Sequence, residues 1–324
     1  MADHALVTLD EVRAAAGRIG GVAVRTPLLA CLWSDPDRPL WLKPESLQAT
    51  GAFKIRGALN AVATLTEDER RRGIVAHSSG NHAQAVAYAA KLAGIRATIV
   101  MPDVTPLVKQ EATRSHGAEI VLVDPEERDT YSAKLVAEHG YVLIPPYDDP
   151  RIIAGQGTVG LEIAADAPDV DVVLVPVSGG GLSSGVAVAI TALAPRASVV
   201  LVEPELAADA AESLRTGELT SWTTAQTYRT MADGLRTPSL GQLPWEHLRR
   251  YADRVVTVTE EEIVEAVRVL AAKARLVAEP SGAVATAGYL FHAAELPAGR
   301  KHVAVVSGGN IDPAQYAGLL AGRA

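Results

Sequence analysis

The stretch GIVAHSSGNHAQAVAYAAKLAG, residues 73–94, decides the fold. Its first part, GIVAHS, is short and mostly apolar, which is typical of a buried β-strand. After a serine and glycine turn, an alanine-rich run continues until it ends on glycine, as many helices do. A strand that leads directly into a helix is the repeating unit of parallel α/β folds.

The same unit recurs along the chain. The strands RATIVMP (96–102), AEIVLV (118–123) and YVLIPP (141–146) follow, with helical patterns between them. These elements predict a small α/β domain at residues 70–147, inserted in a larger α/β domain made of residues 1–69 and 148–324. The expected fold class is α/β, with two open parallel sheets. Residues 216–244 show no clear period and are expected to form a long ordered excursion.

Composition narrows the class of protein. The 324 residues carry a formal net charge of −8, which argues against a nucleic-acid or anionic-membrane partner. The single cysteine, Cys31, excludes internal disulfides and multi-cysteine metal sites, and it is expected to pack as a small hydrophobe. Neither a signal peptide nor an apolar run of about 18 residues is evident. We therefore expect a soluble, cytoplasmic protein.

One lysine stands at an unusual place. In QATGAFKIRGALNAV (48–62), Lys54 occupies a predicted helix start, where the helix dipole disfavours a cation. Lysines account for only seven of the 30 basic residues, so this position needs a reason.

A glycine-rich turn follows the predicted strand 172–177. In VPVSGGGLSSG (175–185), consecutive glycines open a helix and can direct several backbone N–H groups at one phosphate, although a plain tight turn would give the same pattern. The segment GLSSG also has the form of a nucleophile elbow, but Ser183 falls inside the helix rather than at the strand-to-helix corner. A hydrolase is therefore not favoured.

Two more turns follow apolar strands. AHSSGNHAQA (76–85) surrounds a helix start and suits either a helix cap or the carboxylate of a small ligand. His77 and His82 are too far apart on a bending turn to share a zinc ion. VAVVSGGNID (303–312) places Ser307 at a strand end, facing a cleft or in a simple turn. AGQGTVG (154–160) is interpreted as a small-residue helix start with close backbone packing.

These features together describe a pyridoxal phosphate enzyme. That cofactor needs a lysine for its Schiff base, an anion site for its phosphate and a partner for its pyridine nitrogen. Lys54, the triple-glycine turn and Ser307 supply one candidate for each need.

The sequence resembles the fold type II pyridoxal phosphate enzymes over nearly its whole length, and most of all the threonine/serine dehydratase (ammonia-lyase) and serine racemase group. The resemblance is carried, in order, by KPESLQATGAFKIRGA, SSGNHAQA, AGQGTVGLE, PVSGGGL, VEP, ADGLRT and SGGN. It implies a large domain that binds the cofactor, a small domain (70–147) that closes over the substrate, and a homodimer or homotetramer.

The resemblance also implies roles for individual residues. Lys54 corresponds to the Schiff-base lysine, Phe53 to the residue beside the ring, Asn81 to the partner of the ring hydroxyl and Ser307 to the partner of the pyridine nitrogen. The phosphate loop corresponds to Ser178, Gly179, Gly180, Gly181 and Leu182. The substrate carboxylate loop corresponds to Ser78, Asn81 and His82. A divalent cation such as Mg²⁺ would be held by Glu203, the Ala207 carbonyl and Asp209, a pattern that a surface acidic turn would also produce.

The implied reaction is the dehydration and deamination of a small 3-hydroxy amino acid, such as L-threonine or L-serine, to a 2-keto acid and ammonia. Lys54, once free, would be the base at Cα. Ser79 matches the serine that racemases place on the opposite face, so serine racemase is an alternative. Arg128 and Tyr147 fall on the substrate side, and an arginine there would suit threo-3-hydroxyaspartate, although a solvated helix-start arginine would look the same. A pyridoxal-phosphate-binding protein without turnover is the remaining alternative.

Overall fold

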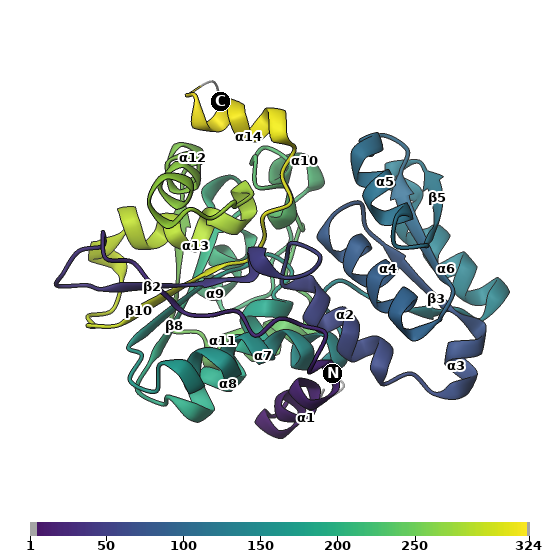
Figure 1. Ribbon diagram of the computed structural model, residues 1–324, viewed down its shortest axis with the longest axis horizontal. Coiled ribbons are helices and arrows are strands. Elements are labelled where there is room, and N and C mark those ends of the chain that lie inside the picture. The colour runs from purple at the N-terminus through teal and green to yellow at the C-terminus, as the bar shows by residue number, and fades with distance from the viewer. Residues whose placement is uncertain (1–4, 323–324) are drawn as a thin grey trace.

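The structure, a computed structural model, describes residues 5–322 and folds them around two open sheets (Figure 1). The larger sheet has the order β1–β2–β10–β7–β8–β9, and only β1 is antiparallel to its neighbour. Its strands are β1 (Leu29–Ala30), β2 (Leu40–Pro44), β7 (Val172–Pro176), β8 (Ser198–Pro204), β9 (Arg254–Val258) and β10 (His302–Val306). The last strand of the chain therefore lies at the centre of the sheet, which puts Ser307 at the middle of its carboxyl edge.

The smaller sheet has the order β5–β4–β3–β6, and all of its pairs are parallel. Its strands are β3 (Ile74–His77), β4 (Ala97–Pro102), β5 (Glu119–Val123) and β6 (Val142–Leu143). These are the four strands predicted from residues 70–147, and both sheets fit the predicted α/β class.

Helices cover the sheets on both faces (Figure 1). The α-helices are α1 (Leu9–Ile19), α2 (Lys54–Ala63), α3 (Glu67–Arg72), α4 (Asn81–Ala93), α5 (Leu107–Arg114), α6 (Arg128–His139), α7 (Pro150–Asp166), α8 (Gly181–Leu193), α9 (Asp209–Thr216), α10 (Thr224–Thr227), α11 (Gln242–Tyr251), α12 (Glu260–Val269), α13 (Pro280–Phe291) and α14 (Pro313–Leu320). A π-helix, η5 (Leu270–Ala274), continues α12.

Alternation along β7 explains why two layers of helices form. Val172 and Leu174 pack with α12 and α13, whereas Val173 and Val175 pack with α7, α8 and α11. A strand with apolar residues on both faces is buried on both sides, as parallel strands usually are. In the smaller unit, α2 and α4 share a core with β3 and β4 on one face, and α6 covers the other.

The α7–α8 contact corrects one prediction. A Cβ on Gly157 would lie 2.9 Å from the Gly185 carbonyl oxygen, so the close backbone packing predicted for residues 154–160 is confirmed. The helix start predicted there is wrong, because α7 begins at Pro150. Asp149 caps it by accepting from the Arg151 N–H, and proline at the first helical position needs no hydrogen bond.

Other local predictions hold. Cys31 is buried and unpaired, and burial raises the pKa of its thiol to about 12. Residues 216–244 are ordered, with α10 and the short 3₁₀ helix η4 (Asp233–Leu235) among loops. In the described part of the chain, no helix combines the length and apolar character that crossing a membrane requires.

Candidate active site

Backbone hydrogen bonds connect the loop before α2 to the end of β10, and these bonds position Lys54. The Phe53 N–H donates to the Ser307 carbonyl (3.0 Å), and Ala52 forms an antiparallel bridge with Gly308. The Gly309 N–H donates to the Gly51 carbonyl at 2.9 Å. Because the carboxyl edge of a parallel sheet is where α/β folds bind ligands, Lys54 begins α2 beside the central strand of such an edge.

Lys54 has no acidic partner among the described residues. Its Nζ donates to the Pro146 carbonyl at 2.6 Å and lies 5.1 Å from the centre of the Phe53 ring. Burial lowers the pKa of the Lys54 amine to about 8. A larger neutral fraction makes this amine a better nucleophile and base near neutral pH than an ordinary lysine.

The triple-glycine turn is packed too tightly for any side chain. Gly180 has φ +90°, a Cβ on Gly179 would lie 2.4 Å from the Tyr147 ring, and one on Gly181 would lie 2.7 Å from Gln156 Oε1. Gly181 begins α8, which has no side-chain cap, so its first N–H groups remain available to an anion. The turn thus fits a phosphate group. Leu182 is buried, and Ser178 Oγ shares a hydrogen bond with the Thr237 hydroxyl.

The start of α4 brings the next predicted residues together. Asn81 is its first residue, and its Nδ2 donates to Glu279 Oε1 at 2.6 Å. Ser78 Oγ accepts from the Gly80 N–H at 3.3 Å, and Ser79 is half-buried. The helix starts of α4 and α8 therefore both lack side-chain caps.

His82 lies beneath this start, with its ring buried. Its Nε2 is 2.8 Å from the Ile144 carbonyl, so Nε2 carries the hydrogen. Burial, then the charge of Lys54, lowers the pKa of the His82 ring to about 3. A neutral ring with its hydrogen on Nε2 has no donor left on Nδ1. The ring therefore has no free N–H to offer a substrate carboxylate, and the substrate contact of His82 stays a prediction.

Ser307 is buried directly after β10, and its Oγ donates to the Ser281 carbonyl at 3.4 Å, a long contact. Tyr147 lies against Gly179 and Gly181. Arg128 is half-buried at the first position of α6, where its carbonyl accepts from Ser132 Oγ. The substrate role expected for Arg128 stays a prediction.

The acidic pair of Glu203, near the end of β8, and Asp209, at the start of α9, is fully buried, which makes the surface-turn alternative wrong. Glu203 accepts from the N–H groups of Ala210 (3.2 Å) and Ala211 (3.0 Å). Neither oxygen of Asp209 has a hydrogen-bond partner in the described chain. Burial raises the pKa of Asp209 to about 7, and burial together with Asp209 raises the pKa of Glu203 well above its usual range. Among residues 5–322, no three His, Cys, Asp or Glu side chains are grouped so that they could hold a metal ion. A third protein ligand beside Glu203 and Asp209 would therefore be a backbone carbonyl, as predicted for Ala207.

Three residues of the site were missed from the sequence. Glu279 and Asn310 both contact Asn81, and Gln156 is fully buried beside Gly181 with neither amide atom hydrogen-bonded in the described chain. A signal existed for Glu279, an acid in the otherwise small and apolar stretch VAEPSGAV (277–284). Asn310 lies in the SGGN motif itself.

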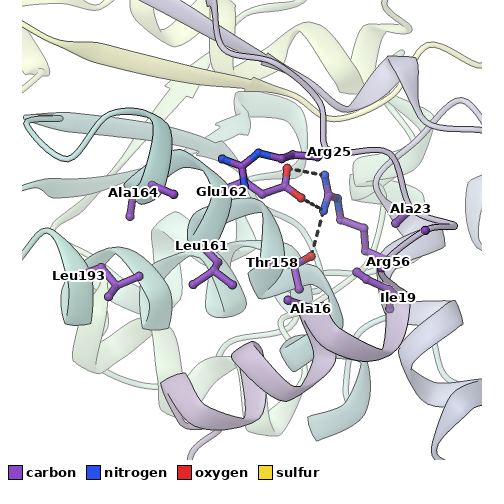
Figure 2. Close-up of a pocket in the computed structure, with 13 residues that line it drawn as sticks. Ala16, Ile19, Ala23, Arg25, Arg56, Thr158, Leu161, Glu162, Ala164 and Leu193 are labelled. Carbon is purple, nitrogen blue, oxygen red and sulfur yellow. Dashed lines mark hydrogen bonds and ion pairs between the residues drawn. The ribbon is translucent and has the colours of Figure 1, made fainter.

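A cluster of buried charged side chains, which we call the charge cluster, includes one residue of α2. Its members are Lys43, Glu45, Arg56 and Glu162, joined by contacts of 2.6–2.9 Å. Figure 2 shows Arg56 between Glu162 and Thr158 at the wall of a cavity of about 490 Å³. None of the predicted site residues lines that cavity.

The two largely parallel sheets match the α/β architecture of fold type II pyridoxal phosphate enzymes. The family described as "Pyridoxal-phosphate dependent enzyme" matches residues 21–308. The chain belongs to this family.

Relatives with known names cover almost the whole chain. An L-threonine ammonia-lyase of Thermotoga maritima is 44% identical over 95% of this chain and 76% of its own length. An L-threo-3-hydroxyaspartate ammonia-lyase of Saccharomyces cerevisiae is 40% identical over 98% of this chain and 97% of its own. The structure of maize serine racemase superposes with a TM-score of 0.90 at 38% identity, covering 96% of each chain.

Proposed function

We propose that the chain catalyses the pyridoxal-phosphate-dependent β-elimination of a small 3-hydroxy amino acid, such as L-threonine or L-serine, to a 2-keto acid and ammonia. The observation that carries the proposal is Lys54, an amine of lowered pKa without a carboxylate partner in the described chain, held beside the central strand end. The name of the Thermotoga relative supports the reaction class.

The residues around Lys54 would each bind a different group of the cofactor. Lys54 would bind its aldehyde, the N–H groups of residues 178–182 its phosphate, Asn81 its ring hydroxyl and Ser307 its ring nitrogen, with Phe53 beside the ring. Support comes from the glycine turn, where a Cβ would clash and where the start of α8 has no side-chain cap. When bound, pyridoxal phosphate supplies an electron-withdrawing ring that makes the Cα–H of an amino acid acidic.

The chain's own groups would then handle protons. Lys54 would accept the Cα proton, because its lowered pKa leaves a useful neutral fraction near pH 7. Ser307 offers a neutral hydroxyl to the ring nitrogen and, unlike a carboxylate, does not hold that nitrogen protonated. A weaker electron sink favours prompt loss of the β-hydroxyl over transamination.

Substrate binding would use the start of α4. The Ser78 hydroxyl and the backbone N–H groups of Asn81 and His82 suit a carboxylate at an uncapped helix end. Arg128 is the candidate for a second carboxylate, which would make threo-3-hydroxyaspartate a substrate. The name of the yeast relative favours this second candidate. Ser79 and the likeness to maize serine racemase favour a racemase side activity.

A substrate panel tests the proposal. The purified enzyme, loaded with pyridoxal phosphate, is incubated with L-threonine, L-serine, L-threo-3-hydroxyaspartate and L-alanine, while keto acid, ammonia and D-enantiomer are measured. We expect keto acid and ammonia in equal amounts from at least one hydroxy amino acid, faster than D-enantiomer, and neither from L-alanine. Dominant D-serine would replace the dehydratase assignment with racemase, and no turnover of any substrate would favour a binding protein.

We also propose a divalent cation, such as Mg²⁺, between Glu203, the Ala207 carbonyl and Asp209. The support is chemical, because two buried carboxylates without a cation repel each other and oxygen ligands suit Mg²⁺.

Residues 70–147 are proposed as the unit that closes over the substrate, with the large domain formed by residues 1–69 and 148–324. A homodimer or homotetramer in the cytoplasm is proposed from the resemblance. Light scattering of the purified enzyme would give its oligomeric state.

A further inference from the structure

The side-chain amide of Asn81 is held at both ends. Its Oδ1 accepts from Asn310 Nδ2 at 2.8 Å, and its Nδ2 donates to Glu279 Oε1 at 2.6 Å. The three residues come from separate places, since Asn81 begins α4 on the smaller sheet, Glu279 precedes α13 and Asn310 follows β10 (Figure 1). The amide thus connects the two sheets.

A backbone carbonyl fixes which way each amide points. Asn310 Nδ2 also donates to the Thr50 carbonyl at 2.8 Å, and a carbonyl can only accept. Asn310 must therefore present its NH₂ group to Asn81, which must present its oxygen in return. The Asn81 NH₂ group is then directed at Glu279, and only one of its two hydrogens is used there.

Glu279 suits the role of acceptor because it is buried and is not neutralised by a direct ion pair in the described chain. A Cβ on Gly308 would lie 2.2 Å from Glu279 Oε1, so only glycine at position 308 leaves room for this carboxyl group. Burial, then the charge of Asp233, raises the pKa of Glu279 to about 8, while Asn81 and Lys109 oppose the rise. A neutral carboxyl still accepts from Asn81 through its carbonyl oxygen.

The same contacts reach the loop that positions Lys54. Thr50 and Gly51 lie in this loop, and a Cβ on Gly51 would lie 2.3 Å from Asn310 Oδ1. The Gly309 N–H binds the Gly51 carbonyl on the other side. A change in the Asn81 amide is therefore linked, through Asn310, to the backbone that presents Lys54.

We infer that Glu279 and Asn310 are positioning residues that lock the Asn81 amide with one N–H directed away from Glu279 and available to the cofactor's ring hydroxyl. The inference rests on the proposed role of Asn81. Without Glu279, the NH₂ group loses its acceptor, and without Asn310 the amide loses the contact that sets its orientation. Either loss would weaken the donor that Asn81 offers.

The test compares four variants, Asn81→Ala, Glu279→Ala, Glu279→Gln and Asn310→Ala, with the double variant Asn81→Ala/Glu279→Ala. Each is measured without substrate, by the wavelength of the bound cofactor's visible absorbance and by the dissociation constant for pyridoxal phosphate. Lys301→Ala is the matched control, since it removes a 2.5 Å ion pair with Asp169 and takes no part in the contacts of Asn81 or Glu279. Circular dichroism shows which variants are folded.

We expect Asn81→Ala and Glu279→Ala to shift the absorbance alike and to raise the dissociation constant about 10-fold each. The double variant should be no worse than Asn81→Ala alone. Glu279→Gln should retain the wild-type spectrum, because its amide oxygen can accept the same bond. Asn310→Ala should show the same direction of change, which keeps the test valid if Glu279→Ala does not fold. The control should retain the spectrum.

Two results would overturn the inference. One is a wild-type spectrum and affinity in both Glu279→Ala and Asn310→Ala while Asn81→Ala is altered. The other is additive losses in the double variant, which would mean that Glu279 acts independently of Asn81. A wild-type spectrum in Asn81→Ala itself would instead disprove the proposed role of Asn81, so the two failures are distinguishable.

Discussion

Lys54 and Arg56 are two residues apart in α2 but belong to opposite kinds of buried polar region. Arg56 donates to Glu45, Glu162, Thr158 and the Val24 carbonyl. Lys54 donates to a single carbonyl, that of Pro146. The charge cluster consists of two cations and two anions that hydrogen-bond one another. Lys54, in contrast, has no carboxylate partner in the described chain.

The pKa shifts of Arg56 and Glu45 follow the same division, although burial lowers the pKa of Lys43 in spite of Glu162. Burial alone would lower the pKa of Arg56, yet Glu45 and Glu162 raise it above its usual value. Burial alone would raise the pKa of Glu45, yet Arg56 lowers it. For Lys54 burial acts unopposed. Charges that are fully paired stay charged and stabilise a fold, whereas a buried group left without a partner is poised for chemistry.

The strongest test of this comparison replaces the two cations of α2, Lys54 and Arg56, one at a time. Lys54→Ala should lower turnover by about 1,000-fold or more, because base and cofactor attachment are lost together. Its cofactor-free form should be at least as stable as wild type, since a buried amine without a partner costs free energy. Turnover and urea unfolding of the cofactor-free protein measure the two effects.

Arg56→Leu should do the reverse. It leaves Glu45 buried without a cation, so the free energy of unfolding should fall by about 3–5 kcal/mol. Whatever folded enzyme remains should still bind the cofactor. A stable Arg56→Leu protein would mean that the charge cluster is dispensable, and a destabilised Lys54→Ala protein would mean that Lys54 is structural.

How well the sequence predicts these two regions depends on how far apart in the chain their contacting residues lie. Lys54, the glycine turn and Ser307 each sit at a strand-to-helix junction, where local pattern already fixes position. The charge cluster is not visible locally, because Arg56 meets Glu162 across 106 positions of the chain. Glu279 is missed for the same reason, since its partner Asn81 is 198 positions away. The start of α7 at Pro150 is missed because the small residues of 154–160 suggested a helix start there, whereas they serve the α7–α8 contact.

The acidic pair sharpens the comparison, since it is buried like the charge cluster but lacks cations. Saturating Mg²⁺ should stabilise the wild type by about 2–3 kcal/mol at 100 times its dissociation constant. Asp209→Ala should abolish this response, because it removes the carboxylate whose oxygens are unpaired in the described chain. Thermal unfolding with Mg²⁺ and after chelation provides the measurement. Equal Mg²⁺ stabilisation in both proteins would place the cation elsewhere.

The smallest effect concerns the titration of Lys54 in the cofactor-free protein. Only the neutral amine reacts with acetic anhydride, so a pKa of about 8 predicts a rate that rises roughly 10-fold from pH 7 to pH 9 and levels off above pH 8. Lys134 is the internal control for the activity of the reagent, because its side chain is 57% exposed. Mass spectrometry of the two peptides gives both rates at once. A Lys54 rate that keeps rising to pH 10 would remove the distinction between Lys54 and the charge cluster, because Lys54 would then titrate like a solvated amine.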